Sequence, residues 1–160
     1  MDTSNLEELE GGYELRQQSI KQNWLTITGF FLEKGTKARF KYWPADLAET
    51  DIGYSGYGIK QLFELDINYV RGIADDNLTL LTVVLSDKVK GFICKSTPED
   101  IITHSPFFHF DILDENDESI YTSHDFGDDV LMFLTPTDFE KLTNLHIAKS
   151  ALISLPETIE

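Results

Sequence analysis

FFHFDILDENDESIYTSHDFGDDVLMFL, residues 107–134, is the stretch that decides the fold. Its apolar runs are rich in aromatic and β-branched residues, and acidic, turn-forming residues separate them. Short runs of this composition, bounded by Asp, Asn, Ser and Gly, are typical of strands joined by tight turns. We therefore predict three consecutive strands over residues 107–113, 119–124 and 130–134.

Upstream of this segment, further apolar runs predict more strands. The runs WLTITGFFL (24–32) and KARFKYW (37–43) flank the turn EKGT and are expected to form a hairpin. Residues 62–70, 78–85 and 88–94 are expected to add three antiparallel strands. In a strand over 37–41, Lys37, Arg39 and Lys41 share one side, which we interpret as a polar outer face.

Two helices are predicted near the C-terminal end. Thr97-Pro98-Glu99-Asp100 combines a cap, a proline and acids, and predicts a short helix that Ser105-Pro106 closes. Thr137-Asp138-Phe139-Glu140 is interpreted as a capping box, and apolar residues continue at helical spacing from Phe139 as far as Leu155. We expect this second helix to pack on the sheet, so that Leu145→Asp would be severely destabilising.

Many strands with segregated helices indicate an α+β fold. We predict a mainly antiparallel, twisted sheet of about six to eight strands, with the C-terminal helix and one short helix packed on it. The 160 residues fit one domain, expected over 13–160, and 41% of them are hydrophobic, which argues against a disordered chain. Gly11-Gly12 interrupts the apolar spacing, so residues 1–12 are expected to be flexible, with a short helix over about 14–22 left open.

A single cysteine, Cys94, excludes an intrachain disulfide and a cysteine-cluster zinc site. Its apolar neighbours favour a buried strand position, and a reducing, cytoplasmic location fits best. The acidic N-terminus has neither the basic nor the apolar region of a secretion signal, and no segment has the length of a membrane span.

The negative charge is concentrated in one region. Residues 96–140 carry twelve acids and no Lys or Arg, in a chain of net charge −15. Such a field attracts cationic partners and repels polyanions, and Tyr121 and Phe126 are expected to anchor the contact. The alternative is an ordinary solvated face. The residues expected to bind the partner are Asp111, Asp114, Glu115, Asp117, Glu118, Tyr121, Asp125, Phe126, Asp128 and Asp129.

The expected function is that of an intracellular acidic protein that binds and inhibits a basic protein. Immunity proteins that block cationic nuclease toxins, and DNA mimics, represent this class. We expect no direct binding of nucleic acid or membrane and no catalytic activity, because no nucleophile motif occurs and the glycine-rich GYSGYG (53–58) fits no phosphate-binding spacing. The sequence leaves the oligomeric state open.

Metal ions and cofactors are not expected. Asp114, Asn116, Glu118 and Asp125 match positions 1, 3, 5 and 12 of a calcium loop, but Ser119 stands where that loop requires glycine.

The histidines His104, His109, His124 and His146 lack the spacing of metal ligands. The second interpretation is a small enzyme or ligand-binding domain with a site near His104, His109, His124 and Asp125. Convergence of these side chains in a pocket would favour that interpretation, and a convex acidic face would favour the first.

Overall fold

The computed structural model describes residues 11–47, 56, 58–65, 67–74, 77–95 and 107–155. Its strands form one sheet in the order β3-β4-β2-β5-β6-β7-β1-β8, and every neighbouring pair is antiparallel. The predicted α+β fold is therefore confirmed. The strands are β1 (Gly11–Leu15), β2 (Lys37–Tyr42), β3 (Tyr69–Ile73), β4 (Thr79–Val84), β5 (His109–Leu113), β6 (Ser119–His124), β7 (Asp129–Leu134) and β8 (Leu152–Ser154).

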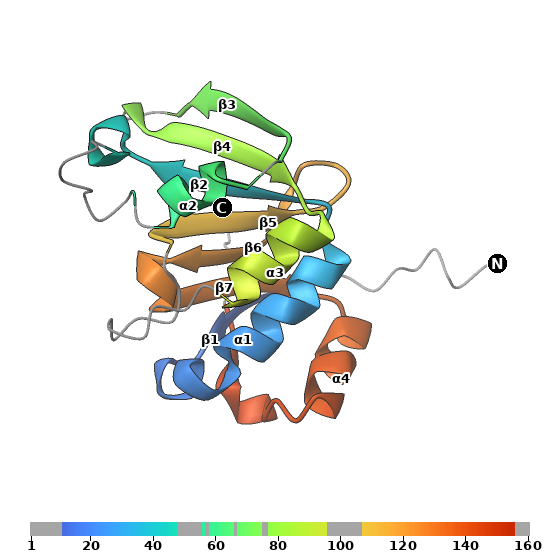
Figure 1. Cartoon of the computed structure of the whole chain (residues 1–160). Helices are drawn as coiled ribbons and strands as arrows, with labels where there is room; N and C mark the ends of the chain where they lie inside the picture. The colour runs from blue at the N-terminus through green and yellow to red at the C-terminus, as the bar shows by residue number, and fades with distance from the viewer. Residues whose placement is uncertain are drawn as a thin grey trace, which may run out of the picture.

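The helices are α1 (Gln17–Lys34), α2 (Ile59–Phe63), α3 (Asp87–Lys95) and α4 (Pro136–Asn144), with 3-10 turns η2 (Pro44–Leu47), η5 (Asp125–Gly127) and η6 (Lys149–Ala151). Figure 1 shows α1 and α3 side by side across one face of the sheet. None of the described helices combines the length and the apolar character that a membrane crossing requires.

The core lies between α1 and the sheet. The ring of Phe31 in α1 is 5.2 Å from that of Tyr121 in β6, which is 5.8 Å from Phe110 in β5. On β2, Lys37, Arg39 and Lys41 are partly exposed and the residues between them are buried, so the predicted polar face is confirmed.

The predicted strand over 24–32 is wrong, because these residues form the second half of α1. Ile20, Trp24, Ile27 and Phe31 are all buried, and their spacing follows the helical period. The free energy gained by burying this stripe is larger than the preference of the β-branched and aromatic residues in 24–32 for a strand. The turn after α1 requires Gly35, since a Cβ there would lie 2.2 Å from the side chain of Ile112.

Two more predicted strands differ in the structure. Of the predicted strand 62–70, Leu62 and Phe63 end α2 and Tyr69 and Val70 begin β3, while residues 88–94 form most of α3. Val89 and Ile93, one turn apart, are buried there, whereas Cys94 is only partly buried. Burial raises the pKa of the Cys94 thiol, which keeps it protonated.

The strands predicted over 78–85, 107–113, 119–124 and 130–134 are confirmed as β4, β5, β6 and β7. At the N-terminal end, Gly11 and Gly12 pair with Leu134 and Phe133 in β1, so the predicted flexible segment does not extend to them. Residues 1–10 and the predicted helix over 97–105 lie outside the described residues.

Helix α4 begins two residues earlier than predicted and is much shorter. Thr135 is its N-cap, with Asp138 as the reciprocal partner and Pro136 at the first turn. The helix ends at Asn144, and His146 has a left-handed φ of 69°, which turns the chain towards η6 and β8. Leu145 is consequently 48% exposed, and its predicted core position is wrong.

We now expect Leu145→Asp to lower the free energy of unfolding by less than about 1 kcal/mol. An exposed site imposes no buried-charge cost, and the remaining penalty is that of an anion at a helix C-terminus, about 0.3–1 kcal/mol. Thermal unfolding of the variant measures this directly. A decrease of several kcal/mol in the free energy of unfolding would indicate that Leu145 is buried in the core.

Candidate functional site

The acidic residues of 111–129 do not form one surface. The turn 114–118 joins β5 to β6, whereas the turn 125–129 follows β6 and leads into β7. The six residues of β6 separate the two turns by roughly 20 Å. The two acidic turns must therefore be considered as separate candidate sites.

In the turn 114–118, carboxylates stabilise the turn itself. Asp114 accepts hydrogen bonds from the backbone N–H groups of Asn116 at 2.8 Å and Glu118 at 3.0 Å. Asp117 accepts one from Lys37 at 2.9 Å. Half of the four acids therefore have a structural role, and Glu115 and Glu118 are the exposed pair that remains.

The turn 125–129 has an unusual backbone. Asp125, Phe126 and Gly127 have successive φ values of 53°, 59° and 90°, all in the left-handed region. A bulky aromatic residue rarely adopts this conformation, which costs about 1–3 kcal/mol at a residue other than glycine. The surrounding contacts hold Phe126 in a conformation that its own chemistry disfavours.

Phe126 belongs to an aromatic cluster formed by Trp43, Phe108, His124 and Phe126. The Phe108 ring is 5.8 Å from Phe126, 5.8 Å from Trp43 and 5.2 Å from His124. Trp43, Phe108 and Phe126 are partly exposed and His124 is exposed.

Acids border this aromatic cluster. Asp125 and Asp128 are exposed, and Asp129 is partly exposed. Aromatic area with an acidic rim is suited to bind a surface that is itself apolar and basic.

Two residues expected at the contact surface lie in the interior instead. Tyr121 is 1% exposed, and its hydroxyl shares a 2.5 Å hydrogen bond with Thr28 on α1. Burial raises the pKa of Tyr121, so its hydroxyl stays protonated. Asp111 is 4% exposed. The predicted role of Tyr121 as a surface anchor is wrong, and Asp111 is not available to a docking partner.

Asp111 is the centre of a polar network between β2, β5 and β6. Strand register places it opposite Arg39 and Thr122. Its carboxylate accepts from Thr122 Oγ1 at 2.6 Å and Ser119 Oγ at 3.3 Å, and lies 3.2 Å from His109 Nε2 and 3.5 Å from Arg39 Nη2.

Burial alone would raise the pKa of Asp111. Hydrogen bonds from His109 and Thr122, with the positive charges of His109 and Arg39, instead lower that pKa to about 2. The carboxylate is therefore ionised at neutral pH and fixes the side chains around it.

Of the enzyme or ligand site predicted near His104, His109, His124 and Asp125, the structure brings together only His109 and His124. His109 and His124 are register partners, with their Nδ1 atoms 2.9 Å apart, but the carboxylate beside His109 is that of Asp111 rather than Asp125. His104 lies outside the described residues. Within the described part of the chain, no three His, Cys, Asp or Glu side chains are placed to hold a metal ion.

Two cavities of the described structure lie elsewhere, one between α1 and α4 and one beside β3 and β4, and neither is lined by these histidines. Comparison with protein-family models, curated proteins and solved structures finds no match for this chain. Its function is therefore inferred from the arrangement of its own side chains.

Proposed function

We propose that the protein binds a basic protein partner through the aromatic cluster and the adjoining acidic turn 125–129. The observation that carries the proposal is the strained Asp125-Phe126-Gly127 turn, which places a partly exposed aromatic ring among acids. Strain of this kind persists where the surrounding structure enforces it, and it is concentrated at functional sites.

The two kinds of side chain have different roles in this proposal. Exposed carboxylates accelerate encounter with a cationic surface by long-range attraction, which salt weakens. The aromatic rings of Phe126 and Phe108 supply the apolar area that slows dissociation once the complex has formed. The net charge of −15 adds to the attraction and disfavours direct binding of nucleic acid.

A protein with such a surface fits the class of inhibitors that neutralise cationic proteins, in which immunity proteins against nuclease toxins and DNA mimics occur. The turn 114–118 is assigned a lesser role, because Asp114 and Asp117 are engaged within the fold.

The test compares two matched double variants. Asp125→Asn/Asp128→Asn and Glu115→Gln/Glu118→Gln each remove two exposed charges, from the two turns respectively. Partners captured from the source cells at low salt are purified, and association is measured by surface plasmon resonance. We expect the first variant to slow association at least about threefold more than the second at low salt, with the difference vanishing at high salt.

Two results would contradict the proposal. Equal on-rates for both variants would show that only the overall charge matters. If the wild-type protein retained no basic protein at low salt, a basic protein partner would be excluded. Asn tolerates the left-handed backbone at position 125, so the variant does not add strain there.

A further inference from the structure

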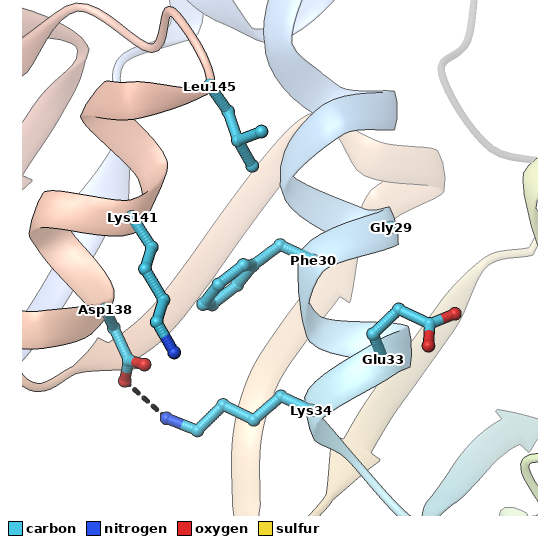
Figure 2. A pocket seen from close by; sticks show the side chains of 7 residues that line it. All are labelled: Gly29, Phe30, Glu33, Lys34, Asp138, Lys141 and Leu145. Atoms are coloured by element: carbon cyan, nitrogen blue, oxygen red, sulfur yellow. Dashed lines mark hydrogen bonds and ion pairs between the residues drawn. The ribbon is translucent and has the colours of Figure 1, made fainter.

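Helices α1 and α4 enclose an open groove of about 550 Å³, shown in Figure 2. This volume falls within the range of small-molecule sites, about 300–1,000 Å³. The groove is separated from the turn 125–129 by the length of β7. It is lined by Gly29, Phe30, Glu33, Lys34, Asp138, Lys141 and Leu145.

One end of the groove has an excess of positive charge. The carboxylate of Asp138, which is buried, pairs with Lys34 and also accepts a hydrogen bond from the backbone N–H of Thr135. In Figure 2, the Lys141 side chain extends towards the same carboxylate, but no ion pair joins it to any carboxylate of the described residues. Two ammonium groups therefore lie at this end of the groove, and only that of Lys34 is paired with the Asp138 carboxylate.

The remaining acid of the groove does not balance this charge. Glu33 is 3.5 Å from Lys90 of α3 and forms its ion pair there. Among the described residues, Lys141 therefore brings one uncompensated positive charge to the groove. An anion placed at this end would replace water around an ammonium that has no ion-pair partner in the described part of the chain.

The rest of the groove is apolar and spacious. Phe30 is partly exposed and points towards α4, and Leu145 is 48% exposed at the end of that helix. Gly29 also lines the groove, and a Cβ built on it meets no atom within 4 Å other than those of its chain neighbours and its own helix backbone. An apolar group in this space would remove both hydrophobic side chains from water.

We infer that the groove binds a small amphiphilic carboxylate, with its anionic head at Lys141 and its apolar body against Phe30 and Leu145. The net charge of −15 does not exclude an anion, because exposed charges are screened beyond about 8 Å at physiological ionic strength. The local ammonium therefore determines which head group is accepted. This site is independent of the binding function proposed above.

Octanoate is the probe, titrated into the full-length protein and followed by ¹H–¹⁵N NMR shifts. We expect saturable, one-to-one shifts confined to the groove helices α1 and α4. Gly29→Phe should weaken octanoate binding at least about tenfold, because its ring occupies the groove. Gly91→Phe is the matched control, since Gly91 is also a helical glycine with no atom within 4 Å of a built Cβ, and it should bind as the wild type does.

The charge is tested separately. Lys141→Gln should weaken octanoate binding about two- to fivefold, the size expected of one exposed ion pair, and should leave octanol binding unchanged. Lys149→Gln, which removes an exposed charge outside the groove, should leave both unchanged. Thermal unfolding checks that each variant is folded.

Three results would overturn the inference: no saturable octanoate binding, equal binding by the Gly29→Phe and Gly91→Phe variants, or equal effects of Lys141→Gln on octanoate and octanol. Each of them leaves the proposed partner-binding function unaffected, because no residue of the turn 125–129 is changed.

Discussion

Tyr121→Ala is expected to lower the free energy of unfolding by about 4 kcal/mol, as for other large buried aromatic side chains truncated to alanine. The ring packs against Phe31 and Phe110, and its hydroxyl bonds to Thr28. Tyr121→Phe should cost about 1 kcal/mol, because it leaves the buried Thr28 hydroxyl without this partner. Urea denaturation at equilibrium measures both values.

Phe126→Ala is the control for this prediction, because Phe126 is the other aromatic residue that the sequence proposes as an anchor. Its ring is partly exposed, so its removal should cost less than half as much stability and should chiefly accelerate dissociation of a bound partner. A denaturation midpoint for Tyr121→Ala equal to that of the wild type would be incompatible with a core position.

The strands β5, β6 and β7 could be predicted because their residues satisfy local rules: β-favouring runs end at acidic and glycine-containing turns. Helix α1 could not be predicted from composition alone, because its buried stripe of Ile20, Trp24, Ile27 and Phe31 begins before the β-favouring run that starts at Trp24. A composition rule applied only from Trp24 onward does not detect this helical period. The same local bias gave a strand in place of α3.

The positions of the two acidic turns follow from the sequence, and so does their separation. Consecutive antiparallel strands place successive turns at opposite ends of the sheet, so a strand over 119–124 puts 114–118 and 125–129 at opposite ends of that strand. Which aromatic residue faces outward depended on packing against α1, which was predicted as a strand. Phe108, which joins Trp43 to Phe126, had no local signal that separated it from the buried Phe110.

Asp111 illustrates what local patterns cannot provide. Its pairing with Thr122 follows from the β5–β6 hairpin, but its contact with Arg39 requires the register between β2 and β5, strands 72 residues apart in the chain. The pairing of β2 with β5 forms only in the folded sheet. Because of it, Asp111, which was predicted as a surface acid, is buried and ionised.

Asp111→Asn is accordingly expected to lower the free energy of unfolding by about 3 kcal/mol at neutral pH. The variant removes the anion that Arg39, His109 and Thr122 contact, and loss of one partner of a largely buried ion pair costs about 3–5 kcal/mol. The lower end applies because the Arg39 side chain is 29% exposed. Within the described structure, Arg39 Nε is buried without a hydrogen-bond partner, so the guanidinium has little to replace the carboxylate.

The effect should depend on pH in a defined direction. The folded-state pKa of Asp111, about 2, lies below the ordinary value of 3.8, so its ionisation stabilises the fold fully above about pH 4 and this contribution is lost as the pH falls through 2. The stability difference between wild type and Asp111→Asn should therefore shrink by about 2 kcal/mol between pH 5 and pH 2. Groups other than Asp111 are present in both proteins, so their contributions cancel in the difference. Glu115→Gln, at an exposed position, should change the free energy of unfolding at neutral pH by less than about 0.5 kcal/mol. If the difference between wild type and Asp111→Asn stays constant from pH 5 to pH 2, the Asp111 carboxylate is not held ionised by Arg39, His109 and Thr122.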